Sequence, residues 1–275
     1  MQATSRDGAT VRVLITGCSS GFGWGTAAEL TKRGHEVIAT ARRPQVLDDL
    51  DVAQRLALDV DSDASVAAAV AAAGRIDALV NNAGFGVIGP VERLPIDEGK
   101  RMFETNFFGA LRMIQAVLPQ MRERSDGTII NVTSVAGRVA PPLDGMYGAS
   151  KFALEGLTEA LKLEVGHFGI KVALVEPGFF ETTFSDNARR FGTDSAPYDE
   201  LEVAWDKAMS RLRGGAETGA GPQAVVSTIA DLVESDAPAL RNPVGDDARM
   251  VLGARAAMDD ATFEATMRET LELDW

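Results

Sequence analysis

The chain has 275 residues, of which 45% are hydrophobic and 24% charged, so it holds enough apolar material for a substantial core. A net charge of −13 without a basic stripe argues against a nucleic-acid partner. No run approaches the roughly 18 apolar residues that cross a bilayer, and Met1 to Thr10 lacks an apolar signal core. The single Cys18 cannot form an intrachain disulfide. We therefore expect a cytoplasmic protein with no membrane partner.

Strand and helix signals alternate in the first third of the chain. Short β-branched and apolar runs predict strands over 11–16, 35–40, 54–59 and 76–81. Helices are expected between them, over 21–33, 45–50 and 64–73, and Gly34 and Gly74 mark two helix ends. Strands that alternate with helices indicate a parallel sheet.

The alternation continues as far as Gly178. A long helix is expected over 97–124, with Asp97 as its N-cap, followed by a strand over 128–133, a helix over 147–168 and a strand over 170–176. Right-handed crossovers then wind the chain on both sides of the sheet. The predicted fold class is α/β, a single Rossmann-like, doubly wound parallel sheet of about seven strands with helices on both faces.

The pattern changes after Gly178. Residues 179–221 look irregular, with aromatic and methionine residues among charges, which is typical of a substrate-binding lid. A helix over 222–234, a strand near 243–245 and a terminal helix over 262–273 follow. We expect one domain over 1–275, made of a cofactor-binding and catalytic core (11–178), a substrate loop or lid (179–222) and C-terminal helices with the last strand (223–275).

A glycine-rich loop joins the first strand to the first helix. Gly17 permits a tight turn, while Gly21 and Gly23 let backbone approach a phosphate and let the helix pack on the strand. The N-terminus of the helix offers free N–H groups and the positive end of its dipole. These features predict a pyrophosphate-binding loop, to which we assign Gly17, Ser19, Ser20, Gly21, Phe22 and Gly23.

The end of the second strand predicts which nicotinamide cofactor is bound. A carboxylate there would bind the adenosine ribose, whereas a basic residue accommodates a 2′-phosphate. The sequence has Arg42 and Arg43 and no carboxylate, and a guanidinium binds phosphate in a bidentate manner. We therefore expect NADP(H), although both arginines could instead be exposed loop charges. The remaining expected contacts are Asp59 and Val60 at the adenine and Asn82, Ala83 and Gly84 beside the cofactor.

Tyr147 and Lys151 lie four residues apart at the start of a predicted helix, so their side chains share a face. Tyrosine is a weak base at neutral pH, but a neighbouring ammonium should lower its pKa and allow proton exchange with a carbonyl or alcohol oxygen. Ser134 follows the fifth strand, where its hydroxyl can hold the same substrate oxygen. Alone, the Tyr/Lys pair would be an ordinary surface pair; with Ser134 and the glycine loop it indicates a proton-transfer site.

With these motifs, the sequence resembles the classical short-chain dehydrogenase/reductase family, in particular the branch that contains 17-beta-hydroxysteroid and retinol dehydrogenases. The matching pieces run in family order over residues 11–182: the Thr16–Gly23 loop, Asn81-Asn82-Ala83-Gly84, Ser134, Tyr147-Gly148-Ala149-Ser150-Lys151, and Pro177-Gly178 with Thr182. The resemblance implies that Asn106 is a fourth catalytic residue, supporting a water that relays protons to Lys151. It also implies that Pro177, Gly178 and Thr182 lie at the nicotinamide, and that Tyr147 and Lys151 contact the cofactor.

The predicted function is hydride transfer between NADP(H) and a ketone or aldehyde, or the reverse alcohol oxidation, on a bulky apolar small molecule. No metal site is expected. An epimerase or dehydratase of the same fold and a non-enzymatic NADP(H)-binding sensor are the alternatives. The family resemblance implies a homodimer or homotetramer through the two long helices, and a substrate pocket that includes Val87, Leu143 and Met146.

Overall fold

The computed structural model describes residues 9–180, 188–192, 196–215 and 221–272. Seven parallel strands form one sheet in the order β3-β2-β1-β4-β6-β7-β9. This order confirms the predicted doubly wound sheet, because the chain builds outward from β1 in one direction and then resumes at β4 on its other side. The crevice between the ends of β1 and β4 is where such folds bind ligands. The strands are β1 (Arg12–Ile15), β2 (Glu36–Ala41), β3 (Gln54–Ala57), β4 (Ala78–Asn81), β6 (Gly127–Val132), β7 (Ile170–Pro177) and β9 (Arg241–Val244).

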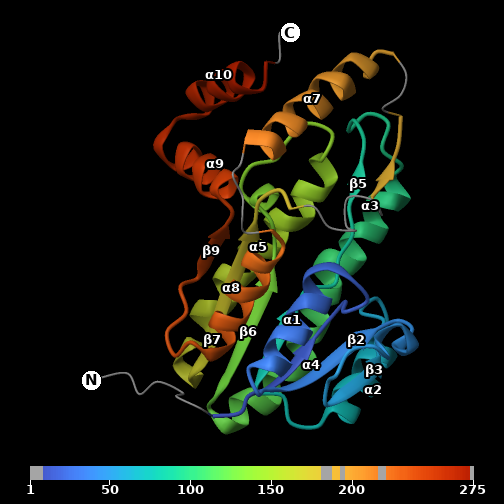
Figure 1. Ribbon diagram of the computed structural model, residues 1–275, viewed down its shortest axis with the longest axis vertical. Coiled ribbons are helices and arrows are strands. Elements are labelled where there is room, and N and C mark those ends of the chain that lie inside the picture. Colours follow the sequence, from blue (N-terminus) through green and yellow to red (C-terminus); the bar gives the residue numbers. More distant parts are fainter. Residues whose placement is uncertain (1–8, 181–187, 193–195, 216–220, 273–275) are drawn as a thin grey trace.

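Helices cover both faces of the sheet (Figure 1). On one face, α1 (Gly21–Lys32) and α8 (Gln223–Glu234) pack over a buried apolar cluster. On the other face, α2 (Asp63–Ala73), α4 (Ala110–Arg124) and α5 (Gly145–Val165) bury a second cluster. The strands β4, β6 and β7 are buried along almost their whole length, since both of their faces are covered. The sheet is therefore a rigid support for the loops at its carboxyl edge.

The predicted single helix over 97–124 is three segments in the structure. An α-helix, α3 (Ile96–Phe103), runs into a π-helical turn, η2 (Glu104–Gly109), which continues as α4. Asp97 is not the N-cap, because the helix already begins at Ile96, after Pro95. The π-helical turn contains Asn106, and π-turns inside α-helices are frequently found at functional sites.

Residues 179–221 are more regular than the sequence indicated. A helix, α7 (Asp199–Gly215), occupies much of this segment, and β8 (Arg189–Arg190) pairs in parallel with β5 (Val87–Ile88). After β9 the chain forms α9 (Asp246–Ala257), which was not predicted, and α10 (Asp260–Leu271). Figure 1 shows α7, α9 and α10 at the end of the molecule to which β9 leads. The predicted irregular backbone is therefore wrong over Asp199–Gly215, where α7 lies.

Short 3-10 turns lie between several of these helices and strands. The helix expected over 45–50 is a single turn, η1 (Pro44–Leu47), and α5 ends in a similar turn, η4 (Gly166–Phe168). A third turn, η3 (Val135–Gly137), follows Ser134 directly, and Ser134 caps it by accepting a hydrogen bond from the Ala136 N–H at 3.1 Å. Ser134 is therefore held in place by its local backbone. None of the described helices combines the length and apolar character that a bilayer crossing needs.

Candidate active site

A cleft of about 1050 Å³ runs along the carboxyl edge of the sheet. Its walls come from the segments that directly follow β1, β2, β3, β4, β6 and β7, together with α5, α7 and α10. Small-ligand sites typically measure roughly 300–1,000 Å³, so this cleft has room for a dinucleotide and a substrate together. Most of the predicted site residues line it: Gly17, Ser19, Ser20, Gly21, Phe22, Arg42, Asp59, Val60, Asn82, Ala83, Gly84, Ser134, Tyr147, Lys151, Pro177 and Gly178.

The glycine loop has the conformation that its sequence predicts. Gly17 and Gly21 have φ angles of +73° and +59°, which strongly favour glycine. A side chain at Gly17 would place its Cβ 2.8 Å from the Cα of Ala83. Gly23 does not line the cleft; a Cβ there would collide with the carbonyl oxygen of Gly17 and the amide of Asn82. Gly23 therefore serves the packing of α1 on the loop.

Asn82 fastens the end of β4 to the glycine loop. Its side-chain nitrogen donates hydrogen bonds to the carbonyl oxygens of Thr16 and Gly17, at 2.9 and 3.1 Å. In return, the hydroxyl of Thr16 accepts hydrogen bonds from the backbone N–H groups of Asn82 and Ala83. The two strand ends on either side of the crevice are thus joined into one preformed surface.

The two arginines after β2 lie in different places. Arg42 is exposed and lines the cleft, and no ion pair joins it to another residue that the structure describes. Arg43 is exposed too, but it is not among the cleft-lining residues and directly precedes η1. Thr182, the expected nicotinamide contact, lies outside the described residues.

Ser134, Tyr147 and Lys151 meet at the end of the cleft away from Arg42. The Lys151 Nζ donates a hydrogen bond to the carbonyl oxygen of Val132 at 3.0 Å and lies 5.8 Å from the centre of the Tyr147 ring. The Ser134 hydroxyl is 3.5 Å from the carbonyl oxygen of Pro177. A phenol, a hydroxyl and an amine therefore face one small region of the cleft.

The electrostatics of Tyr147 differ from the sequence-based expectation. Burial raises the pKa of Tyr147 above its ordinary value; a hydrogen bond with Ser134 acts against this rise, and the charge of Asp144 adds to it. Burial also lowers the pKa of Lys151 to about 8, with Glu155 opposing the fall. The expected lowering of the Tyr147 pKa by Lys151 is absent, because the buried amine is itself a weakened cation and its nitrogen is directed to the Val132 carbonyl.

Asn106 acts as a clamp at this site. Its side-chain oxygen accepts from the Phe85 N–H at 3.0 Å, and its nitrogen donates to the Phe85 carbonyl at 3.0 Å and to the Ser150 hydroxyl at 3.2 Å. Ser150 in turn donates to the carbonyl oxygen of Tyr147 at 2.7 Å. Both N–H groups of the amide are used, so the side chain ties the segment after β4 to α5. Phe85 was not predicted from the sequence, because it binds Asn106 through its backbone N–H and carbonyl groups, which any residue type has.

The other part of the cleft is apolar and includes residues from two helices far apart in the sequence. Ile88, Leu201, Trp205, Met209 and Met267 line it. Met267 belongs to α10, so this wall also includes a residue outside the segment 179–222. The expected pocket residues Val87, Leu143 and Met146 lie behind this surface, in packed apolar clusters. The spacing of Leu201, Trp205, Ala208 and Met209 fits one helical face and could have revealed this wall.

Asp144 is a further cleft residue that the sequence analysis missed. It lies one helical turn before Tyr147, and burial raises the pKa of its carboxyl to about 6 while the charge of Arg190 opposes the rise. Within the described ranges, no group of three or more His, Cys, Asp or Glu side chains could hold a metal ion. The side chains of Ser134, Tyr147 and Lys151 are groups that can donate or accept hydrogen bonds and protons, and the charge of Asp144 raises the pKa of Tyr147.

Comparison with known proteins agrees with this geometry. The sequence model described as short chain dehydrogenase matches residues 11–192. The chain is 39% identical to the 3-ketodihydrosphingosine reductase of Bacteroides thetaiotaomicron, over 85% of this chain and 87% of the relative. It is 38% identical to human retinol dehydrogenase 8, over 83% and 79% of the two chains.

Solved structures show the same fold. A short-chain dehydrogenase from Streptomyces avermitilis superposes with a TM-score of 0.80 at 34% identity, covering 96% of this chain and 98% of the other. More distant structures, at 25–26% identity, include a Burkholderia cenocepacia short-chain dehydrogenase in complex with NADP (TM-score 0.73) and a Brucella melitensis 3-ketoacyl-(acyl-carrier-protein) reductase complexed with NADH (TM-score 0.71). With the glycine loop, the sheet order and the cleft all in agreement, this chain belongs to the short-chain dehydrogenase family of oxidoreductases.

Proposed function

We propose that the protein is an NADP(H)-dependent oxidoreductase that interconverts a bulky apolar ketone or aldehyde and the corresponding alcohol. The observation that carries this proposal is the convergence of Ser134, Tyr147 and Lys151 at one end of a cleft whose other end is a glycine loop. A relative named as a keto reductase and another named as a retinol dehydrogenase support carbonyl–alcohol chemistry. The apolar wall of Trp205, Met209 and their neighbours supports a bulky apolar substrate.

The cleft fits a dinucleotide. Beside Gly21 there is open space where a side chain would stand, and α1 begins at this residue, so backbone N–H groups face the cleft. Gly17, Ser19 and Ser20 would hold the pyrophosphate, and Lys151 the nicotinamide ribose. When bound, the nicotinamide supplies or accepts the hydride.

The protein's own residues manage the substrate oxygen and its proton. In the reducing direction the Tyr147 hydroxyl donates its proton to the carbonyl oxygen, and Ser134 donates a hydrogen bond to the same oxygen as charge develops on it. The raised pKa of Tyr147 keeps it protonated and ready to donate at neutral pH. Ser134 bonds to the phenolate oxygen that remains, since its hydrogen bond lowers the pKa of Tyr147, and Asn106 ties α5 to the segment after β4.

A panel of bulky ketones, followed at the NADPH absorbance, tests the proposed function. Consumption of NADPH in proportion to alcohol formed is the expected result. Product formation without net NADPH consumption would instead indicate an epimerase or dehydratase. Tight NADPH binding without any product from the panel would favour the non-enzymatic sensor. The presence of all four expected catalytic residues argues against such a sensor; they are Asn106, Ser134, Tyr147 and Lys151.

Replacing Arg42 by Ala should raise the KM for NADPH by roughly 10- to 100-fold, because a charge-assisted hydrogen bond to the 2′-phosphate contributes about 1.5–3 kcal/mol. The KM for NADH should stay nearly unchanged, since that cofactor lacks the phosphate. Steady-state kinetics with both cofactors measure this. Arg43→Ala is the matched comparison and should have the smaller effect, because Arg43 is not among the cleft-lining residues. A wild-type preference for NADH would contradict the assignment.

Replacing Asp144 by Asn should shift the pH dependence of alcohol oxidation to lower pH, by about half a unit. Oxidation needs Tyr147 as the phenolate, so its rate rises with pH through the pKa of Tyr147, and the Asp144 charge raises that pKa. Below a pH of about 6 the carboxyl of Asp144 is protonated, and the variant should then match the wild type. Rates measured across a pH series test this, and a shift to higher pH would refute the coupling.

A further inference from the structure

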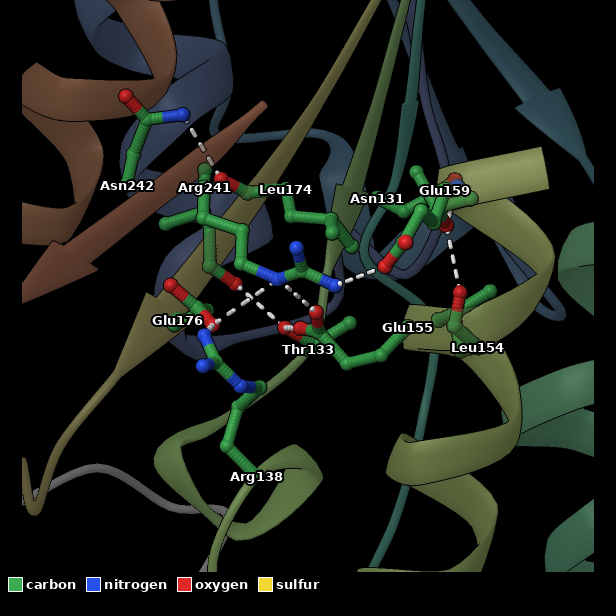
Figure 2. A network of polar contacts seen from close by, with 12 residues as sticks. Asn131, Thr133, Arg138, Leu154, Glu155, Glu159, Leu174, Glu176, Arg241 and Asn242 are labelled. Carbon is green, nitrogen blue, oxygen red and sulfur yellow. Dashed lines mark hydrogen bonds and ion pairs between the residues drawn. The ribbon is translucent and has the colours of Figure 1, made fainter. Parts of the chain in front are cut away.

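Beneath the active site lies a group of charged side chains that the proposed mechanism does not use. Glu155 on α5 and Glu176 on β7 are 3% and 1% exposed. Figure 2 shows Arg241 reaching from β9 toward both glutamates, while Arg138 approaches Glu176 from the opposite direction. The Arg241 Nε lies 3.0 Å from Glu155 Oε2 and 3.9 Å from Glu176 Oε1, and the Arg138 Nη1 lies 3.3 Å from Glu176 Oε1.

One hydrogen bond connects this group to Ser134. The hydroxyl of Thr133, the residue directly before Ser134, donates to Glu155 Oε1 at 2.7 Å. The backbone N–H of Thr133 also donates to the Val175 carbonyl at 2.8 Å. The same hydroxyl also lies 3.0 Å from the Val175 carbonyl oxygen. Glu155 and Val175 together therefore hold Thr133, the residue to which Ser134 is joined, and Glu155 is the charged one of these two anchors.

The same glutamate faces Lys151. It lies one helical turn further along α5, and the backbone at Gly137 packs against both residues: a Cβ there would lie 3.0 Å from Glu155 Cγ and 3.3 Å from the Lys151 carbonyl oxygen. The other charged groups around Glu155 are Glu159 on α5, Arg241 on β9, and the Arg138–Glu176 pair. The negative charge of Glu155 raises the pKa of Lys151 against the effect of burial.

We propose that Glu155 is a positioning residue that couples the two sides of the catalytic site, fixing Ser134 through Thr133 and supplying the negative charge that keeps the buried Lys151 protonated. The inference rests on the proposed roles of Ser134 and Lys151. Arg241 keeps this carboxylate ionised and correctly oriented, because the guanidinium is the cation bonded to it. The last strand of the sheet is thereby linked to the chemistry, although Arg241 is not among the cleft-lining residues.

The test is Glu155→Gln, compared with Glu159→Gln. Both glutamates bind Arg241, Glu155 through Nε at 3.0 Å and Glu159 through Nη2 at 2.7 Å. Glu159 is exposed, and its hydrogen bond in the described part of the chain goes to Arg241 and not to Thr133 or Lys151. NMR titration of carbon-labelled lysine side chains, assigned with Lys151→Arg, measures the Lys151 midpoint in the complete protein. We expect Glu155→Gln to lower it by about one pH unit and Glu159→Gln to leave it unchanged. An unchanged midpoint in Glu155→Gln, or equal shifts in both variants, would overturn the proposal.

Thr133→Val tests the connection to Ser134 separately and does not alter a buried charge. The variant loses the hydrogen bond to Glu155 but keeps the volume of the side chain, so kcat for ketone reduction should fall roughly tenfold while the Lys151 midpoint and the KM for the cofactor stay constant. An unchanged kcat would refute this half of the proposal. If the Lys151 midpoint moves in Glu155→Gln but no ketone is reduced by any form of the protein, the electrostatic coupling holds and the proposed reaction is wrong.

Discussion

Tyr147→Phe is expected to lower kcat for ketone reduction by about 10²–10⁴-fold while leaving cofactor affinity nearly unchanged. The substitution removes only the hydroxyl that exchanges a proton with the substrate oxygen. The ring stays, and with it the packing of Tyr147 against the cluster that contains Val87, Leu94 and Met102. Titration with NADPH, followed by its fluorescence, measures cofactor binding. Quantification of the alcohol formed at fixed reaction times measures turnover.

The second tyrosine of the chain provides the matched control. Tyr198 is half-buried, outside the set of cleft-lining residues, and its hydroxyl bonds to Glu92 at the surface. Tyr198→Phe should therefore keep wild-type kcat. Turnover retained by Tyr147→Phe would show that the proton comes from another group, and the assignment of the whole catalytic set would then have to be abandoned.

Replacing Arg241 by Met should lower the free energy of unfolding by about 3 kcal/mol. The reason is the penalty for leaving ionised carboxylates in the interior: Glu155 loses its cation, and Glu176 keeps only Arg138. Burial raises the pKa of both carboxyl groups, and the arginines oppose this rise. Without Arg241 the pKa values should rise further, and protonation then becomes the way in which the buried charge is neutralised. Urea denaturation of the wild type and the variant gives the difference.

The sign of the pH dependence distinguishes this cause from a loss of packing. A carboxyl whose pKa is raised on folding destabilises the folded state when it is ionised, so its cost disappears as the pH falls below the folded-state pKa. The deficit of Arg241→Met should thus be smaller in acid than in neutral buffer, whereas a packing defect would be constant. Arg249→Met is the control, because Arg249 and Asp246 form an exposed pair that should contribute less than about 1 kcal/mol.

Much of the fold could be predicted from local patterns in the amino-acid sequence. The strands of the sheet are short apolar runs separated by helices, and burial on both faces accounts for the lack of polar alternation in β4 and β6. Gly17 and Gly21 require conformations that few other residues adopt, so their place in the sequence predicted the loop. The candidate catalytic residues could be predicted from their chemistry and their positions. Ser134 follows a strand end, and Tyr147 and Lys151 share one helical face.

Other features depend on contacts that no local pattern encodes. The bond between Glu155 and Arg241 joins residues 86 positions apart, and isolated charges in the sequence do not reveal which of them are buried together. The Tyr147 pKa was predicted in the wrong direction, because spacing along a helix indicates proximity to Lys151 but not the loss of solvent around both groups. The helix α7 is different, because the spacing of its apolar residues does fit one helical face and the prediction overlooked that pattern.

The π-helical turn over Glu104–Gly109 has a consequence for changes in chain length. A π-turn accommodates one more residue than an α-helical turn, so deletion of one residue from this stretch would let the backbone close as a regular α-helix. The residues inside the turn would then change direction relative to α3 and α4, because each residue of an α-helix turns by about 100°. Asn106 would turn away from Phe85 and Ser150, even though every residue type needed by the site was still present. Substitution at the outward-facing Phe108, which is 43% exposed, leaves the turn intact, so this position should tolerate exchange of its residue although the stretch should not tolerate insertion or deletion.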